Sequence, residues 1–217
     1  GYLEPVMLRL EKRFAKPPAG YSEQRVEKMA EEMEPALPAS DGAPPDVILI
    51  INESWFDWNQ LTDFETDRPI TPFIDSLDNC VRGFAVNPNL STSGAEYEVL
   101  TSNCTALMPS LTPFTQMNLS GTNSLVKHLD QLGYSSVSFH PASYANYNCK
   151  SVYPNLGFET SWFWNWEEEN PLYAQLENPM FVHNGLSDKS CFDYVVELYE
   201  ERDTSRPAFL YNLTYQN

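Results

Sequence analysis

The segment Asp46-Val-Ile-Leu-Ile-Ile51 constrains the fold more than any other part of the sequence. Every position after Asp46 carries a branched aliphatic side chain, which is typical of a strand that is covered on both faces. Such strands occur chiefly in parallel sheets, because helical crossover connections lie over both faces of those sheets. We therefore expect this segment to be a central, parallel strand of an α/β domain.

The rest of the chain alternates predicted strands with predicted helices. Further strands are expected over 83–86, 135–139 and 207–214, and helices over 22–34, 71–77, 95–100, 123–133 and 190–201. Proline and glycine predict a turn over 153–158, which leads into an aromatic stretch at 162–166. This alternation predicts an α/β fold with a mainly parallel central sheet flanked by helices.

Composition divides the chain into an arm and a domain. Residues 1–45 form two predicted helical stretches and a linker rich in proline and alanine, whereas residues 46–217 contain all the predicted strands. We expect 1–45 to be a helical juxtamembrane-type arm and 46–217 to be the folded domain. No run of 18 apolar residues and no signal peptide occurs in the sequence.

The charge balance excludes one class of partner. Thirteen Lys and Arg residues against thirty Asp and Glu residues give a formal net charge of −17. Nucleic-acid binding needs clustered basic side chains, so DNA and RNA are disfavoured, and so is tight adhesion of this chain to an anionic membrane surface.

The cysteines give no metal or disulfide framework. Cys80, Cys104, Cys149 and Cys191 are widely spaced and form no C-x-x-C pair. This spacing excludes the common zinc fingers, and isolated structural thiols are favoured over the two bridges that an even number permits.

The segment from Ser91 to Ser93 has two interpretations. A hydroxyl at a helix start caps exposed backbone N–H groups, and Ser93 with Glu96 forms a Ser-x-x-Glu capping box. Alternatively, one of the three hydroxyls is a nucleophile, because the positive end of a helix stabilises an alkoxide or a bound phosphate. An alcohol needs a base or a metal ion to activate it, and the residues alone do not separate the three hydroxyls.

Three candidate groups follow predicted strands. Glu53 follows the first strand, the hydroxyls of 91–93 follow the second, and His140 follows the third. Open α/β sheets bind ligands at the carboxyl ends of their strands, so a site is expected along this edge. Taken singly, Glu53 is also compatible with a helix cap and His140 with a buried core residue.

The order of six segments resembles the alkaline-phosphatase/sulfatase superfamily, and within it the extracellular domain of lipoteichoic acid synthase-type phosphoglycerol transferases. The segments are Val47-Ile-Leu-Ile-Ile-Asn-Glu-Ser54, Thr71-Pro-Phe-Ile-Asp-Ser-Leu77, Ser91-Thr-Ser-Gly-Ala-Glu-Tyr97, Phe139-His-Pro141, Tyr153-Pro-Asn-Leu-Gly-Phe158 and Phe209-Leu-Tyr-Asn-Leu-Thr214. The resemblance covers about 46–217 and implies a sulfatase-like fold.

The resemblance assigns roles to individual residues. It implies that Glu53 is a metal ligand and that Thr92 is both the nucleophile and a metal ligand. His140 corresponds to a histidine near the substrate phosphate, and Tyr147 to an aromatic residue of the substrate site. The family has an arginine two positions later, where this chain has Cys149; the neighbouring Lys150 is the candidate for the missing charge.

The family completes its metal site with an Asp-His pair far downstream and a further histidine after the last strand. Neither occurs here, and His128 and His183 do not match those positions. We therefore expect the chain to be the N-terminal portion of a catalytic domain, truncated at its C-terminal side and not competent as an enzyme by itself.

The resemblance implies a metal-dependent phosphoglycerol transferase on the extracellular face of a bacterial cell membrane, attached through a segment outside this chain. An Mn²⁺ or Mg²⁺ ion would activate Thr92, which would attack a lipid phosphodiester such as phosphatidylglycerol. A polyglycerolphosphate or glycan hydroxyl would then accept the phosphoglycerol group. Two alternatives stay open: a phosphatase or phosphodiesterase that uses water, and a non-catalytic extracellular binding domain whose aromatic segment, Trp162–Trp166, contacts glycans or lipid headgroups. A formylglycine-type sulfatase is disfavoured, because its Cys/Ser-x-Pro-x-Arg motif is absent.

Overall fold

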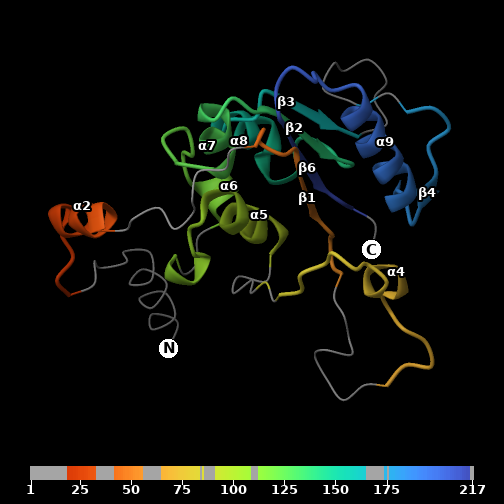
Figure 1. The fold of residues 1–217 in the computed structure, drawn as a ribbon, viewed down its shortest axis with the longest axis horizontal. Coiled ribbons are helices and arrows are strands. Elements are labelled where there is room, and N and C mark those ends of the chain that lie inside the picture. The colour runs from red at the N-terminus through yellow and green to blue at the C-terminus, as the bar shows by residue number, and fades with distance from the viewer. Residues whose placement is uncertain are drawn as a thin grey trace, which may run out of the picture.

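A four-stranded parallel sheet organises the domain (Figure 1). The computed structural model describes residues 19–32, 42–55, 65–83, 85, 91–108, 112–164, 174 and 176–215. Its strands stand in the order β1-β6-β2-β3, with bounds β1 Val47–Ile51, β6 Ala208–Leu213, β2 Ser135–His140 and β3 Thr160–Phe163. All three pairings are parallel, which confirms the predicted α/β class.

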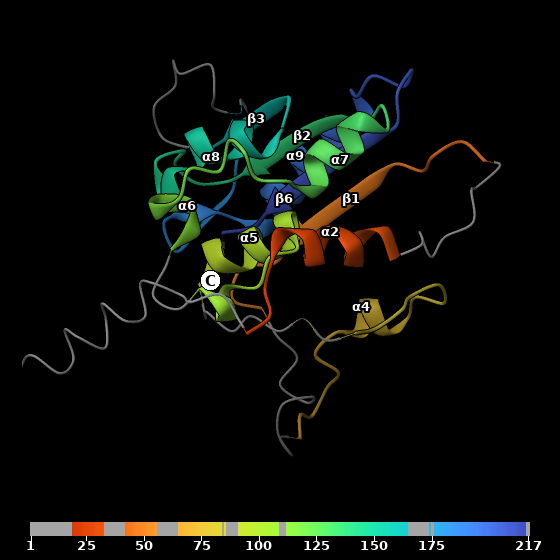
Figure 2. The same ribbon diagram turned by 90° about the vertical axis from the view of Figure 1, so that its left-hand side faces the viewer.

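Helices cover both faces of the sheet. One face carries the helices α5 Thr92–Thr101, α6 Pro113–Gln116, α7 Leu125–Gln131 and α8 Cys149–Leu156. The other face carries α9 Asp188–Glu200 and a hairpin of two short strands, β4 Phe181–Val182 and β5 Gly185–Leu186. In Figure 1 β1 and β6 lie between α5 and α9, and Figure 2 views the domain from the side of α5 to α8, with α9 behind α7. Two 3-10 turns, η1 Thr105–Leu107 and η2 Asn146–Asn148, complete the connections.

Two buried clusters hold the layers together. The larger joins α5 to α8 with the sheet and includes Tyr97, Tyr153 and Tyr211, each at most 1% exposed. The smaller packs α9 against Phe139 and Leu210 on the opposite face. Because residues of one strand alternate between the faces, β6 contributes to both clusters, and all six of its residues are buried.

The first strand is parallel, as predicted, but it is not central among the described strands. β1 pairs with β6 alone, and Ile48 and Ile50 are 47% and 40% exposed. The central position belongs to β6, which lies between β1 and β2. Half of the predicted strand over 83–86 falls outside the described residues, and the two described residues, Gly83 and Ala85, are not in a strand.

One local prediction was wrong. The expected turn over 153–158 is largely the second half of α8, which ends at a Gly157 cap with φ 107°. The predicted helices over 123–133 and 190–201 are present as α7 and α9. Their buried apolar residues are Val126 and Leu129 in α7 and Cys191, Tyr194 and Val195 in α9.

Outside the sheet, the described chain holds two further helices, α2 Glu23–Glu32 and α4 Pro72–Asp75, and neither has a buried residue. The predicted linker falls largely outside the described residues, so the proposed arm over 1–45 remains a prediction. No helix in the described ranges is both long and apolar enough to span a bilayer. All four cysteines are free thiols; Cys149 and Cys191 are buried, as expected of structural thiols, whereas Cys80 and Cys104 are exposed.

Candidate active site

The loops that follow β1 and β6 are tied together at the carboxyl edge of the sheet. The backbone N–H of Thr214 donates to the Ile51 carbonyl at 3.0 Å, and the N–H of Glu53 donates to the Thr214 hydroxyl at 2.9 Å. These reciprocal contacts hold the backbone of Glu53 at the end of a buried parallel sheet. The position is where α/β folds place ligands, as the sequence predicted.

Helix α5 begins beside Glu53. Its N-cap is Ser91, whose hydroxyl accepts a hydrogen bond from the backbone N–H of Gly94 at 3.1 Å. Thr92 is therefore the first helical residue, at the positive end of the helix dipole. The Thr92 hydroxyl donates to Oε1 of Glu53 at 3.0 Å. Two residues that lie 39 positions apart thus bring a carboxylate and an alcohol into direct contact.

The predicted capping box was wrong. The cap is Ser91, and Ser93 is fully buried, with no hydrogen-bond partner for its Oγ. Glu96 is also fully buried, and its Oε1 accepts hydrogen bonds from the hydroxyls of Tyr153 at 2.7 Å and Tyr211 at 2.8 Å. Of the three adjacent hydroxyls, that of Ser91 caps the helix and that of Thr92 contacts the Glu53 carboxylate.

Burial governs the electrostatics of Glu96. Loss of solvent raises the pKa of its carboxyl to about 7, with a smaller upward contribution from the negative charge of Glu53, while the two tyrosine hydroxyls oppose the rise. Oε2 of Glu96 has no hydrogen-bond partner. The carboxyl group therefore lies one helical turn after Thr92 and titrates near neutral pH.

His140 ends β2 on the same edge and is 2% exposed. Burial lowers its pKa to about 4, and the hydrogen bond to the Leu213 carbonyl only partly opposes that decrease. Nδ1 lies 3.3 Å from this carbonyl, which can only accept, so Nδ1 carries the proton. The neutral imidazole then keeps a lone pair on Nε2.

These groups surround one cavity of about 300 Å³. Its lining comprises Glu53, Thr92, His140, Asn146, Tyr147, Leu213 and Tyr215. Glu53 and Thr92 also line an adjoining cavity of about 230 Å³, together with Ser54 and Ser91. Four of the five residues named as site candidates from the sequence therefore meet at one place.

Lys150 is the fifth candidate and does not line this cavity. It is exposed, and its Nζ lies 5.0 Å from the ring centre of Tyr144. Cys149, at the position of the family's arginine, is fully buried, and burial raises the pKa of its thiol well above the usual value. Neither side chain places a positive charge in the cavity.

Tyr215 and Asn146 line the cavity but were not predicted. Tyr215 comes two residues after β6, so the rule that selected Glu53 and His140 would also have selected it. Asn146 belongs to an irregular connection after β2, for which the sequence gives no periodic signal.

The oxygen ligands fit part of a site for a hard divalent cation. Oε1 of Glu53 accepts from Thr92 and also from the Ser54 hydroxyl at 3.3 Å, so a carboxylate and two hydroxyls converge. Mg²⁺ and Mn²⁺ prefer such ligands. Across the described ranges, no group of three or more His, Cys, Asp and Glu side chains is placed to hold a metal ion.

The chain belongs to the sulfatase family, whose sequence profile matches residues 45–217. It is 26% identical over 202 residues to a Rhizobium meliloti protein that is named, provisionally, for the modification of cyclic beta-1,2-glucan. That match covers 92% of this chain and 29% of the relative.

Two solved structures share the fold. The Streptococcus pyogenes phosphoglycerol transferase GacH, in complex with sn-glycerol-1-phosphate, superposes with a TM-score of 0.67 at 21% identity, over 93% of this chain and 54% of that one. The lipoteichoic acid synthase LtaP of Listeria monocytogenes gives a TM-score of 0.58 at 20% identity, over 79% of this chain and 40% of that one. The chain thus spans about half or less of the length of each of these three proteins.

Proposed function

We propose that this chain carries the nucleophile half of the active site of a metal-dependent phosphoglycerol transferase, which acts at the extracellular face of a bacterial membrane. The contact between Thr92 and Glu53 carries the proposal, because it places an alcohol at a helix N-terminus and against a carboxylate. The names of the two solved relatives and the glycerol phosphate bound to one of them support the choice of group transferred.

In the proposed reaction, Oγ1 of Thr92 forms a bond to the phosphorus of a lipid phosphodiester such as phosphatidylglycerol. The bond from phosphorus to the diacylglycerol oxygen breaks, and the threonine proton ends on that oxygen. Glu53 and Thr92 would hold an Mn²⁺ or Mg²⁺ ion, which would supply positive charge against the phosphate and lower the pKa of the alcohol. In this proposal further metal ligands come from residues outside this chain, as the resemblance implies.

The chain's own residues contribute three effects. The N-terminus of α5 stabilises negative charge at Thr92. His140, held neutral by burial, offers Nε2 as a hydrogen-bond acceptor to a substrate hydroxyl. Tyr147 and Asn146 line the same cavity and can orient the glycerol group. A polymer hydroxyl would then displace Thr92 from phosphorus, and the Rhizobium relative's name supports a glycan acceptor over polyglycerolphosphate.

The test is a covalent adduct on Thr92. The full-length protein is incubated with Mn²⁺ and phosphatidylglycerol vesicles, quenched in acid, and digested for peptide mass spectrometry. We expect phosphoglycerol on the peptide that contains Thr92, retention of labelling in Thr92→Ser, and its loss in Thr92→Val, which keeps the shape of the side chain but removes the hydroxyl.

Other outcomes identify the alternatives. Binding of the vesicles without an adduct in the wild type or in either variant would favour a non-catalytic binding domain. An adduct that decays to free glycerol phosphate, with no transfer to any offered alcohol, would identify a phosphodiesterase that uses water.

A further inference from the structure

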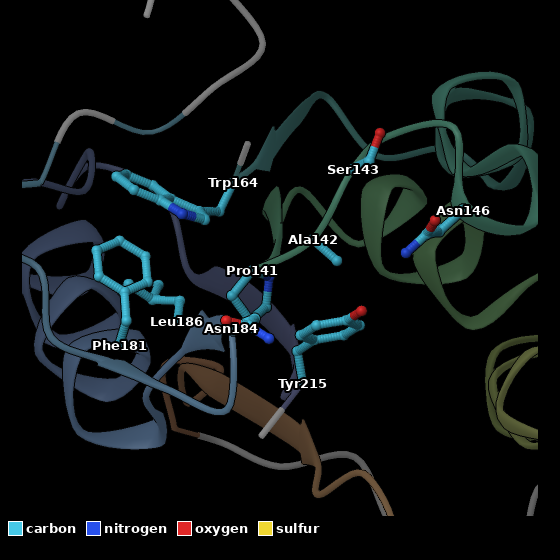
Figure 3. A pocket seen from close by; sticks show the side chains of 10 residues that line it. Pro141, Ala142, Ser143, Asn146, Trp164, Phe181, Asn184, Leu186 and Tyr215 are labelled. Carbon is cyan, nitrogen blue, oxygen red and sulfur yellow. The ribbon is translucent and has the colours of Figure 1, made fainter. Parts of the chain in front are cut away.

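A second cavity, of about 200 Å³, lies beside the candidate active site (Figure 3). We call it the neutral pocket; it is lined by Pro141, Ala142, Ser143, Asn146, Trp164, Phe181, Asn184, Gly185, Leu186 and Tyr215. Asn146 and Tyr215 also line the cavity that contains Thr92. The neutral pocket is therefore contiguous with the nucleophile's cavity and reaches from it toward the β4–β5 hairpin.

Among the described residues that line the neutral pocket, the Tyr215 phenol is the one ionisable group. None of its ten residues is Asp, Glu, Lys, Arg or His, although the chain has a formal net charge of −17. Its polar groups are the hydroxyls of Ser143 and Tyr215 and the amides of Asn146 and Asn184. Amides and hydroxyls both donate and accept hydrogen bonds, which matches the chemistry of a neutral ligand with several hydroxyl groups.

Two aromatic rings form one wall. The ring centres of Trp164 and Phe181 lie 5.9 Å apart at 41°, and Figure 3 shows both rings on the same side of the pocket. An aromatic face is electronegative at its centre, so it attracts the C–H groups on the face of a sugar ring. Aromatic faces beside uncharged hydrogen-bonding groups favour a pyranose over an anionic or a purely apolar ligand.

The Trp164 side chain has an unused donor. Its Nε1 is buried and has no hydrogen-bond partner, whereas its backbone N–H donates to the carbonyls of His140 and Ala142 at 3.2 Å. A buried donor without a partner typically costs about 1–3 kcal/mol. Nε1 has almost no accessible surface, so a ligand hydroxyl reaches this donor only when the indole shifts, and the aromatic wall and the pocket amides carry the argument for a ligand.

A tight hairpin, which also carries Phe181, holds a further part of the lining in place. His183 and Asn184 connect β4 to β5 with φ of 49° and 66°, which is the backbone of a two-residue type I′ turn. A Cβ at Gly185 would lie 3.0 Å from Cδ1 of Tyr215, so the tyrosine ring packs directly over this glycine. The hairpin therefore positions both Asn184 and Tyr215 before any ligand arrives.

We propose that the neutral pocket binds a pyranose residue of an uncharged glycan acceptor and directs one of its hydroxyls toward Thr92. The proposal rests on the phosphoglycerol transfer proposed above and names its acceptor class. In the transfer step the sugar oxygen forms a bond to phosphorus, the bond from phosphorus to Oγ1 of Thr92 breaks, and the sugar hydroxyl proton ends on Thr92. The active site returns to its starting state without any further reactant.

The experiment separates the two half-reactions in the full-length protein. Adduct formation from phosphatidylglycerol vesicles is timed without an acceptor, and transfer is then followed with methyl β-D-glucopyranoside as the probe. Trp164→Phe keeps an aromatic ring but removes the Nε1 donor, and Asn184→Gly tolerates the positive φ but removes the amide. Val196→Ala, on the exposed face of α9, is the control.

We expect both pocket variants to raise the KM for the glucoside at least tenfold more than they slow adduct formation, and Val196→Ala to change neither. If both variants slow adduct formation and leave the KM for the glucoside unchanged, the pocket belongs to the lipid donor and the proposal is overturned. Transfer to water or glycerol alone, insensitive to both variants, would also overturn it.

A binding measurement keeps the proposal testable if no Thr92 adduct forms at all. Saturation-transfer NMR then asks whether the glucoside contacts the protein and whether Trp164→Phe weakens that contact at least fivefold. Contact that depends on Trp164 would support a sugar pocket while the proposed transfer fails. No contact, or contact that Trp164→Phe leaves unchanged, would overturn the pocket assignment as well.

Discussion

The Tyr211 hydroxyl donates a 2.8 Å hydrogen bond to Glu96, one helical turn after Thr92 on α5. The contact joins residues 115 positions apart and lies beneath the N-terminal half of the helix that carries the candidate nucleophile. Glu96 is fully buried, and burial raises the pKa of its carboxyl to about 7. Glu96 is therefore neutral in acid and charged in mild base while it remains part of the core.

The first prediction concerns Glu96→Gln and stability. The folded chain holds a proton on Glu96 up to about pH 7, whereas the unfolded carboxyl loses it near 4.5. Folding stability from this group is thus complete below about pH 4.5 and decreases as the pH rises to about 7. The decrease amounts to about 3 kcal/mol. In urea unfolding, the free energy of unfolding of Glu96→Gln relative to the wild type should rise by about the same amount between pH 4.5 and 7. A constant difference between the two proteins would contradict the buried, neutral carboxyl.

The second prediction has the opposite sign and concerns His140→Asn, in which the amide can still donate to the Leu213 carbonyl. Burial holds the pKa of His140 at about 4, against an ordinary 6.5. Between about pH 4 and 6.5 the histidine is therefore protonated in the unfolded chain and neutral in the folded one. The free energy of unfolding decreases as the pH falls through this interval.

This loss also amounts to about 3 kcal/mol. The variant does not have this loss, so its free energy of unfolding relative to the wild type should rise as the pH falls, as measured by the same urea titrations. Over the shared interval the effects of Glu96 and His140 oppose each other, and the double variant should show nearly the wild-type pH slope. An imidazole NMR resonance that titrates with a midpoint near pH 7 and is absent in His140→Asn would contradict the lowered pKa of His140.

The edge of the sheet could be predicted from the sequence because the relevant rule is local. Glu53 and His140 each follow an apolar or alternating strand, and parallel strands bring such positions to one edge. Thr92 is selected by the family resemblance, and the structure places its hydroxyl against Glu53; its role as nucleophile stays a prediction.

Glu96 shows why other parts could not be predicted. The Ser-x-x-Glu pattern is the same whether the glutamate caps the helix or enters the core, and the deciding partners, Tyr153 and Tyr211, lie 57 and 115 residues away. The predicted central position of β1 was wrong for a related reason. The composition of the strand indicates how apolar it is, but it does not indicate which strand pairs with each of its edges. The neutral pocket is likewise built from four separate connections that no periodic pattern links.

The third prediction tests the proposed metal site in the full-length protein. Glu53→Gln keeps an oxygen that can accept from Thr92 but removes the negative charge, so Mn²⁺ affinity measured by calorimetry should fall at least tenfold. Glu159→Gln is the matched control, because Glu159 pairs with Arg206 at 2.7 Å on the surface, just before β3. The Mn²⁺ affinity of Glu159→Gln should stay within twofold of the wild-type affinity. Equal effects of the two substitutions would indicate general charge attraction without a site at Glu53.

The fourth prediction concerns Gly157, which ends α8 with φ 107°. A Cβ there would lie 2.8 Å from Cγ of Lys127 and 3.3 Å from its backbone nitrogen, and L residues other than glycine rarely adopt such a φ. Gly157→Ala combines backbone strain with a clash against the first turn of α7, so it should lower the free energy of unfolding by about 1–3 kcal/mol. Gly121→Ala meets no atom within 4 Å and has no positive φ, so its unfolding free energy should stay within about 0.5 kcal/mol of the wild type. Urea unfolding of both variants at one pH makes the comparison, and equal stabilities would show that the α8 terminus accommodates a side chain by moving away from α7.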